Sequence, residues 1–117
     1  MKAVAPRPIS NGEAEVVRQA LSVALKADAP QIAEDAPGKL IVVAECECGC
    51  RSVAFQCGYG ADRQLADGVG VLASGAHIEV IVWERNSEIA SLEFVDHSSS
   101  GELPVKVIRW EEAGHAS

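Results

Sequence analysis

One stretch decides the fold of this chain: residues 77–97, which read HIEVIVWERNSEIASLEFVDH. Apolar and polar side chains alternate along residues 77–85, as is typical of a strand with one buried face. The alternation returns in residues 89–97, after Asn86 and Ser87, which form a plausible tight turn. The stretch therefore predicts an antiparallel hairpin. Its apolar positions on one face are Ile78, Val80, Val82, Ala90, Leu92 and Phe94.

Further strands are expected on both sides of this hairpin. Residues 40–44 form a run rich in β-branched side chains, and residues 52–56 predict a second, short strand. Residues 105–110 predict a last strand, which we place at a sheet edge because Pro104 precedes it. Residues 61–74 are ambiguous, and we interpret them as a helical turn followed by a loop.

The G-x-G-x-x-A run at residues 68–73 fits a dinucleotide-binding pattern by its letters alone. That function requires a strand before the first glycine and a helix after it. Because neither is predicted here, we interpret the run as an ordinary loop.

A helix is predicted near the N-terminus. Ser10 and Glu13 have the spacing of a capping box, and the helix should run over residues 13–27, before Pro30. Apolar residues recur at intervals of three and four positions, which predicts one buried stripe. The stripe comprises Val17, Ala20, Leu21, Ala24 and Leu25.

These elements predict an α+β fold: one N-terminal helix packed on a mainly antiparallel sheet of about five strands. The 117 residues suit a single domain, with loose termini at residues 1–9 and 111–117. We expect Trp83 and Trp110 to fill the core between helix and sheet, and the alternative is that they anchor a partner.

The composition is acidic, with a formal net charge of −7. Basic residues are scattered, so we expect neither a nucleic-acid nor a membrane partner. Five carboxylates crowd the hairpin and form either a solvated face or a docking surface for a basic protein. They are Glu79, Glu84, Glu88, Glu93 and Asp96.

The chain has no apolar run of membrane-spanning length, and its first residues lack the pattern of a secretory signal. We therefore expect a cytoplasmic protein. Thiols stay reduced in that compartment, so clustered cysteines suggest metal or redox chemistry before disulfides.

The cysteines form one cluster. Cys46, Cys48 and Cys50 alternate, so an extended chain would turn all three thiols to one face. Gly49 would allow a bend that draws thiols together, and Cys57 could return from the next strand. The four residues predict a thiolate metal site, for which zinc or copper(I) is favoured.

Two other interpretations of the cluster stay open. Cys48 or Cys50 could act as a reactive thiol in a redox sensor or a cysteine-dependent enzyme, although Glu45 and Glu47 disfavour thiolate formation. Alternatively, the cysteines only pack, because a free cysteine behaves as a small hydrophobic residue.

The segment CECGCRS at residues 46–52, followed by the strands at 78–83 and 89–94, resembles small uncharacterised bacterial proteins with a C-x-C-G-C-x-S segment ahead of an antiparallel hairpin. The resemblance covers residues 40–97. It implies a bacterial cytosolic protein with this strand order, and it implies no activity.

The expected function is that of a non-enzymatic binding or interaction protein with an unknown protein partner. No nucleophile elbow or comparable catalytic signature is present in the sequence. We expect a monomer or a weak homodimer, since Trp110 on an edge strand would permit strand pairing.

Overall fold

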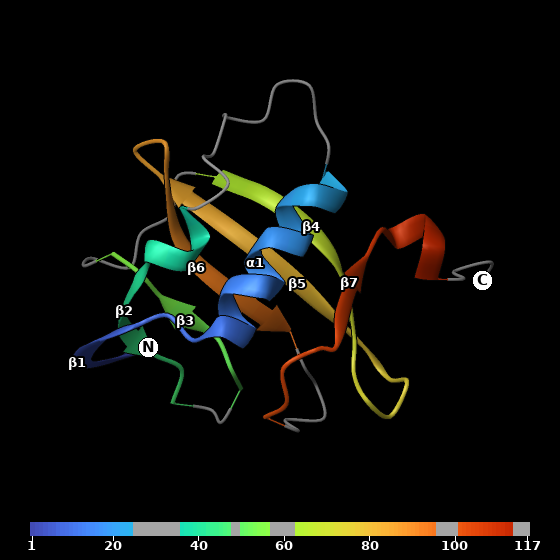
Figure 1. Cartoon of the computed structure of the whole chain (residues 1–117), viewed down its shortest axis with the longest axis horizontal. Helices are drawn as coiled ribbons and strands as arrows, with labels where there is room; N and C mark the ends of the chain where they lie inside the picture. Colours follow the sequence, from blue (N-terminus) through green and yellow to red (C-terminus); the bar gives the residue numbers. More distant parts are fainter. Residues whose placement is uncertain (25–35, 48–49, 57–62, 96–100, 114–117) are drawn as a thin grey trace.

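The computed structural model describes residues 1–24, 36–47, 50–56, 63–95 and 101–113. These residues form one helix packed on a seven-stranded antiparallel sheet, which confirms the predicted α+β class (Figure 1). In chain order the elements are β1 (Lys2–Pro8), α1 (Asn11–Ala24), the 3-10 turn η1 (Pro37–Lys39), β2 (Ile41–Glu45), β3 (Val53–Ala54), β4 (Arg63–Val71), β5 (His77–Arg85), β6 (Glu88–Val95), β7 (Lys106–Ile108) and the 3-10 turn η2 (Trp110–Ala113).

The predicted hairpin lies within the sheet, whose order is β1-β2-β3-β6-β5-β4-β7. Its tight turn is confirmed: Asn86 and Ser87 both have positive φ, at 53° and 65°, between the paired residues Arg85 and Glu88. Positive φ at both central residues matches the type I′ turn that suits the twist of two neighbouring strands.

One half of the hairpin departs from the predicted alternation. Trp83 pairs with Ser91 but Glu84 pairs with Ile89, so Ala90 is an extra residue in β6. Such a bulge shifts the side chains that follow by one position. Ile89 therefore joins the core in place of Ala90.

Helix α1 begins with the predicted capping box. The backbone N–H of Glu13 donates to Ser10 Oγ over 3.1 Å, and the backbone N–H of Ser10 donates to Glu13 Oε1 over 3.0 Å. These two bonds satisfy donors that a helix N-terminus would otherwise leave free. The helix starts slightly earlier than predicted, and residues 25–27 lie outside the described part of the chain.

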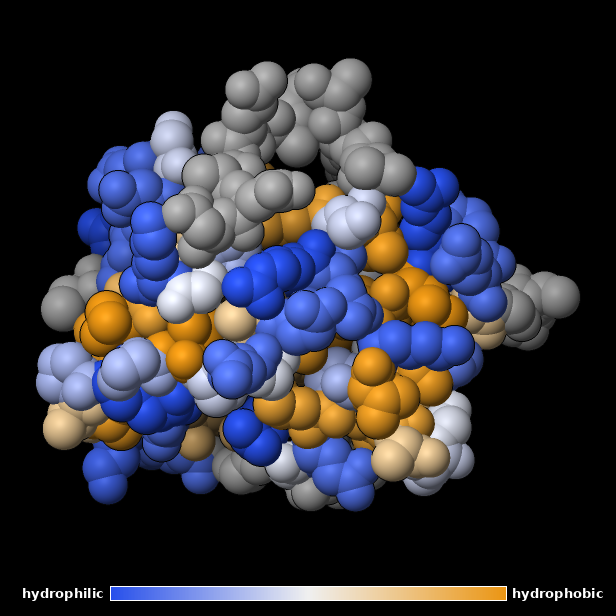
Figure 2. Space-filling view, viewed as in Figure 1, coloured by the Kyte–Doolittle hydropathy of each residue, from blue (hydrophilic) through white to orange (hydrophobic). Residues whose placement is uncertain are grey.

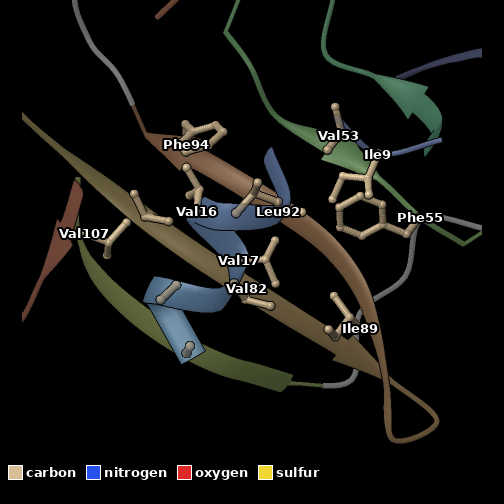
Figure 3. Packing of buried hydrophobic residues seen from close by; sticks show 14 of the residues in the cluster. Ile9, Val16, Val17, Val53, Phe55, Val82, Ile89, Leu92, Phe94 and Val107 are labelled. Atoms are coloured by element: carbon tan, nitrogen blue, oxygen red, sulfur yellow. The ribbon is translucent and has the colours of Figure 1, made fainter. Parts of the chain in front are cut away.

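The core lies between α1 and the sheet. Figure 3 shows Val16 and Val17 of the helix facing Val82 and Leu92 of the central strands, with Ile9 and Phe55 grouped at one side. Burial of these side chains supplies most of the stabilisation that holds the helix in place. The most buried members of the cluster are Val17, Ala20, Val42, Val80, Val82 and Leu92.

The N-terminal residues form a strand, so the predicted loose arm is wrong. Lys2–Pro8 pairs with β2 at the sheet edge, with an irregular register between Ala3 and Arg7. Pro6 and Pro8 are tolerated because one side of an edge strand makes no ladder bonds. Arg7 also forms ion pairs with Glu13 and Glu45, which join β1 to α1 and β2.

Residues 63–71 are also a strand, β4, so the predicted helical turn and loop are wrong there. β4 pairs with β5 along its whole length and with β7 at its end. Its glycines serve close packing: a Cβ on Gly70 would lie 2.8 Å from Val80 Cγ2 and 2.9 Å from Pro104 Cβ. A strand with neighbours on both sides leaves no phosphate-binding loop at residues 68–71.

The last strand, β7, lies at the sheet edge as predicted, although it spans only Lys106–Ile108. Trp110–Ala113 then forms η2, where the sequence predicts a frayed end, and residues 114–117 lie outside the described part.

None of the helices in the described residues combines the length and apolar character of a membrane span. On the helix side, hydrophilic residues cover the centre of the surface and hydrophobic residues flank them (Figure 2).

Candidate functional site

The sheet has a second face, opposite α1, and we call this surface the open face. It is formed by the residues that alternate with core residues along the strands. In β5, Ile78, Val80 and Val82 belong to the core, so the residues between them point to the other side. The open face comprises Asp67, Val69 and Val71 of β4, His77, Glu79, Ile81 and Trp83 of β5, Ser91, Glu93 and Val95 of β6, and Lys106 and Ile108 of β7.

Three carboxylate residues lie on neighbouring strands near the middle of the open face. Asp67 pairs with Ile81, and Ile81 pairs with Glu93 on its other side. Glu79 lies two residues before Ile81 on the same strand and therefore on the same face. Asp67, Glu79 and Glu93, which we call the acidic cluster, thus lie around Ile81, whose own exposure is 5%.

Two tryptophans donate hydrogen bonds to carboxylates of the acidic cluster. The indole Nε1–H of Trp83 donates to Glu93 Oε1 over 2.8 Å, and that of Trp110 donates to Asp67 Oδ1 over 3.2 Å. An indole N–H is a neutral donor, so it orients a carboxylate without neutralising its charge. Trp110 is 40% exposed, and Trp83 lies on the open face and not under α1. The prediction that both tryptophans fill the core is therefore wrong.

The acidic cluster lacks a compensating cation among the described residues. Their ion pairs join Arg7 to Glu13 and Glu45, Arg18 to Glu15, and Arg63 to Glu84, all elsewhere in the molecule. The nearest basic residues on the open face are His77 and Lys106, which lie in the next row of the sheet and both flank Val71. Negative charge therefore accumulates around Ile81.

The environment of Glu79 raises the pKa of its carboxyl group. Partial burial is the largest cause, because it disfavours the charged form. The negative charge of Asp67, a hydrogen bond with Asp67 and the charge of Glu93 act in the same direction. The cluster can thus bind either a proton or a positively charged group.

The other carboxylates of the hairpin do not extend this cluster. Glu84 is buried, with a side-chain exposure of 8%, and is ion-paired with Arg63. Its Oε2 has no hydrogen-bond partner among the described residues. Glu88 is exposed beside the turn and accepts a bond from Gln56. The interpretation of all five as one acidic face is wrong for Glu84, and Asp96 lies outside the described residues.

The predicted thiol cluster is only partly described. Cys46 and Cys50 are half-buried thiols outside any disulfide, whereas Cys48 and Cys57 lie outside the described residues. β2 ends at Glu45, and the Cys46 N–H donates to the Ser52 carbonyl over 3.0 Å, which closes a loop into β3. Cys46 and Cys50 therefore lie in the connection between β2 and β3 and not on a strand.

Both described cysteines contact Ser52, Cys46 through its backbone and Cys50 through its thiol. The backbone bond between Ser52 and Cys46 continues the β2–β3 register by one position, and Cys50 Sγ donates to Ser52 Oγ over 3.2 Å. Ser52 Oγ in turn accepts from the backbone N–H of Phe94 over 2.8 Å. In the part of the chain that the structure describes, no three His, Cys, Asp or Glu side chains are grouped to hold a metal ion.

Sequence reasoning missed Asp67 and the hydrogen bonds of the tryptophans to carboxylates. Asp67 lies in a segment whose structure was ambiguous, and Trp110 reaches it from a different element. A signal for Trp83 was present, because it alternates in register with His77 and Glu79, away from the apolar face.

We compared the chain with protein-family models, with curated proteins and with solved structures, and none of them matches it. The resemblance to small bacterial proteins of the C-x-C-G-C-x-S pattern therefore stays a prediction.

Proposed function

We propose that this protein is a non-enzymatic interaction module that binds a basic segment of a partner protein on its open face. The observation that carries the proposal is the acidic cluster of Asp67, Glu79 and Glu93, which lacks a cation among the described residues and is flanked by two indoles. Lysine or arginine side chains of a partner would supply the missing charge.

The flanking tryptophans suit the same ligand. An exposed indole attracts a lysine or arginine head group through its π face, and it also covers the aliphatic part of such a side chain. Trp110 is 40% exposed and lies against Asp67, so one partner side chain could meet a ring and a carboxylate together. The net charge of −7 would add long-range attraction for a basic partner.

A matched pair of triple variants tests this proposal. The probe is a fluorescein-labelled peptide of alternating lysine and serine, and its anisotropy is followed in dilute buffer. Asp67→Asn, Glu79→Gln and Glu93→Gln together should weaken binding by about threefold to 150-fold, since each exposed charge contributes about 0.2–1 kcal/mol. The amides retain an oxygen that can accept the indole bonds, so the fold is expected to persist.

The control removes three exposed carboxylates elsewhere: Glu15→Gln on α1, Glu47→Gln in the β2–β3 loop and Glu88→Gln at the hairpin turn. It has the same net charge as the first variant and should bind the peptide within about twofold of wild type, because it leaves the local cluster intact. Equal weakening in both variants would contradict a specific site and would indicate attraction by overall charge alone.

A second candidate function rests on Cys46 and Cys50, which contact Ser52 through a backbone N–H and a thiol respectively. We propose that these two thiolates contribute to a structural zinc site, with Cys48 and Cys57, outside the described residues, as the other ligands predicted from the sequence. Reduced thiols at the closed end of one hairpin are the ligand type that zinc prefers.

Metal content tests this second candidate. Protein purified without added metal or chelator should contain close to one zinc per chain by elemental mass spectrometry, with its thiols blocked to a thiol reagent. A chelator should then lower the unfolding temperature, because metal binding stabilises the native state. Metal-free protein with titratable thiols would overturn the proposal, and rapid alkylation of Cys50 alone would favour the redox alternative.

A further inference from the structure

We propose that the side chain of Gln19 closes the β7 edge of the sheet to strand addition and thereby keeps the chain monomeric. The inference goes beyond the proposed function of the open face and does not depend on it. An unpaired edge strand presents backbone N–H and C=O groups on which another strand can form, including the same strand of a second copy. Strand β7 is one of the two edges of the seven-stranded sheet, so its outward groups decide whether such pairing can start.

Within β7, Val107 carries the backbone groups that point away from the sheet. In an antiparallel ladder both groups of one residue point to the same side, and successive residues point to opposite sides. Helix α1 lies beside β7 (Figure 1), and the Val107 N–H donates to Gln19 Oε1 of this helix over 2.7 Å. Val105, just before the strand, donates its own N–H inward to the Val71 carbonyl over 2.8 Å. The outward N–H of β7 is thus already occupied by the helix.

A second hydrogen bond fixes the orientation of the Gln19 amide. Its Nε2 donates to Glu15 Oε2 over 3.1 Å, one helical turn earlier on α1. An amide carries its donor nitrogen and its acceptor oxygen on separate arms, so donation to Glu15 leaves the oxygen to face Val107. Gln19 is half-buried and Val107 is buried, which limits competition from water for the bond between them.

The opposite edge of the sheet is protected in a different way. Ile9, directly after β1, donates its N–H to the Leu40 carbonyl over 2.9 Å and so faces β2. Pro8, the residue before it, then points outward, and a proline has no N–H to offer. Proline on an edge strand is a common protection against edge-to-edge association. Strand β7 contains no proline, and a side chain from the helix has the same effect there.

Without this cap, β7 would suit pairing with a second copy of the chain. In a two-fold pairing centred on Val107, each Val107 N–H would donate to the Val107 carbonyl of the other copy. Val105 is 63% exposed and would lie opposite Arg109 of the second copy in this register. Trp110, which is 40% exposed, follows the other end of the strand, so association would also cover apolar surface.

Sedimentation equilibrium over a series of protein concentrations tests the proposal. Wild-type protein should have the mass of one chain throughout, whereas Gln19→Ala should approach twice that mass as the concentration rises. Gln19→Glu should remain monomeric, because its carboxylate keeps an acceptor for the Val107 N–H. Adding Val105→Lys to Gln19→Ala should restore the monomer, since like charges then lie opposite each other at Arg109 of the paired edge.

Three results would each overturn the proposal: a dimeric wild type, a monomeric Gln19→Ala, or a Gln19→Ala dimer that persists after Val105→Lys. Hydrogen exchange gives a further check that also holds if Gln19→Ala folds poorly. In wild-type protein the Val107 amide should exchange about tenfold more slowly than an uncapped edge amide, the factor expected for one net hydrogen bond. An unprotected Val107 amide would show that Gln19 does not cap the edge.

Discussion

Replacing Arg7 by methionine should lower the free energy of unfolding by about 3 kcal/mol at neutral pH. The side chain of Glu13 is fully buried, and each of its oxygens accepts a 3.0 Å bond from the Arg7 guanidinium. Removing one partner of a buried pair typically costs about 3–5 kcal/mol, because a buried charge is left alone. The lower end applies here, since Arg7 is 36% exposed and solvent screens part of the interaction.

The loss of unfolding free energy in Arg7→Met should be largest at neutral pH and smaller in acid. Burial by itself would raise the pKa of Glu13, but hydrogen bonds from Arg7 and Ser10 outweigh it and hold the pKa below its usual value. A lowered pKa gives a contribution to stability that is complete above the unfolded-state pKa, about 4.3. That contribution disappears as the pH falls through the folded-state pKa, so the difference between wild type and Arg7→Met should narrow in acid.

Urea unfolding at pH 7 and at pH 3 measures both effects. Arg18→Met is the matched control, because Arg18 pairs over 3.5 Å with Glu15, and both side chains are exposed. The control should change stability by less than about 0.5 kcal/mol. Equal losses in the two variants would mean that the Arg7–Glu13 pair does not anchor β1 to the helix.

Replacing Gly70 by alanine should destabilise the fold by about 1–3 kcal/mol, the usual cost of overpacking a filled core. The new Cβ would lie 2.8 Å from Val80 Cγ2, 2.9 Å from Pro104 Cβ and 3.0 Å from Pro104 Cγ. Val80 is fully buried in the core and the proline ring is stiff, so neither neighbour can move aside easily.

Gly38→Ala is the control for this substitution. Its new Cβ would contact Arg18 Nη2 at 3.1 Å, the far end of a flexible side chain that can move away. We expect a change within about 0.5 kcal/mol for the control. If Gly70→Ala unfolded at the same urea concentration as wild type, β4 would not be packed as closely against β5 and Pro104 as described.

The hairpin was predictable because alternation over nine residues on one strand is a strong local signal, and the turn residues suit positive φ. Strand β4 was not predictable, because glycine in a sequence normally indicates a loop. In β4 a glycine is needed instead because Val80 and Pro104 pack too closely against the backbone for a larger side chain. β1 was missed for a related reason: prolines usually exclude a strand, and only its edge position makes them acceptable.

The candidate site was predictable only in part. Glu79 and Glu93 were recognised as hairpin carboxylates, since both lie on strands with clear alternation. Asp67 was missed because β4, the strand that carries it, was not recognised. The sequence therefore gave no indication that Asp67 lies beside β5. The tryptophans were misplaced because large aromatic residues are usually assigned to the core, whereas here their N–H groups bond to surface carboxylates.

The most direct test of the open-face proposal uses the two tryptophans as reporters. The chain contains only two, so each indole N–H gives one signal in a nitrogen–proton correlation spectrum. Because Trp83 bonds to Glu93 and Trp110 bonds to Asp67, both signals should shift with one common dissociation constant as the lysine–serine peptide is added. Backbone signals of exposed α1 residues such as Glu15 should stay in place. Indole signals that do not move while signals from α1 or the β2–β3 loop shift would contradict the account.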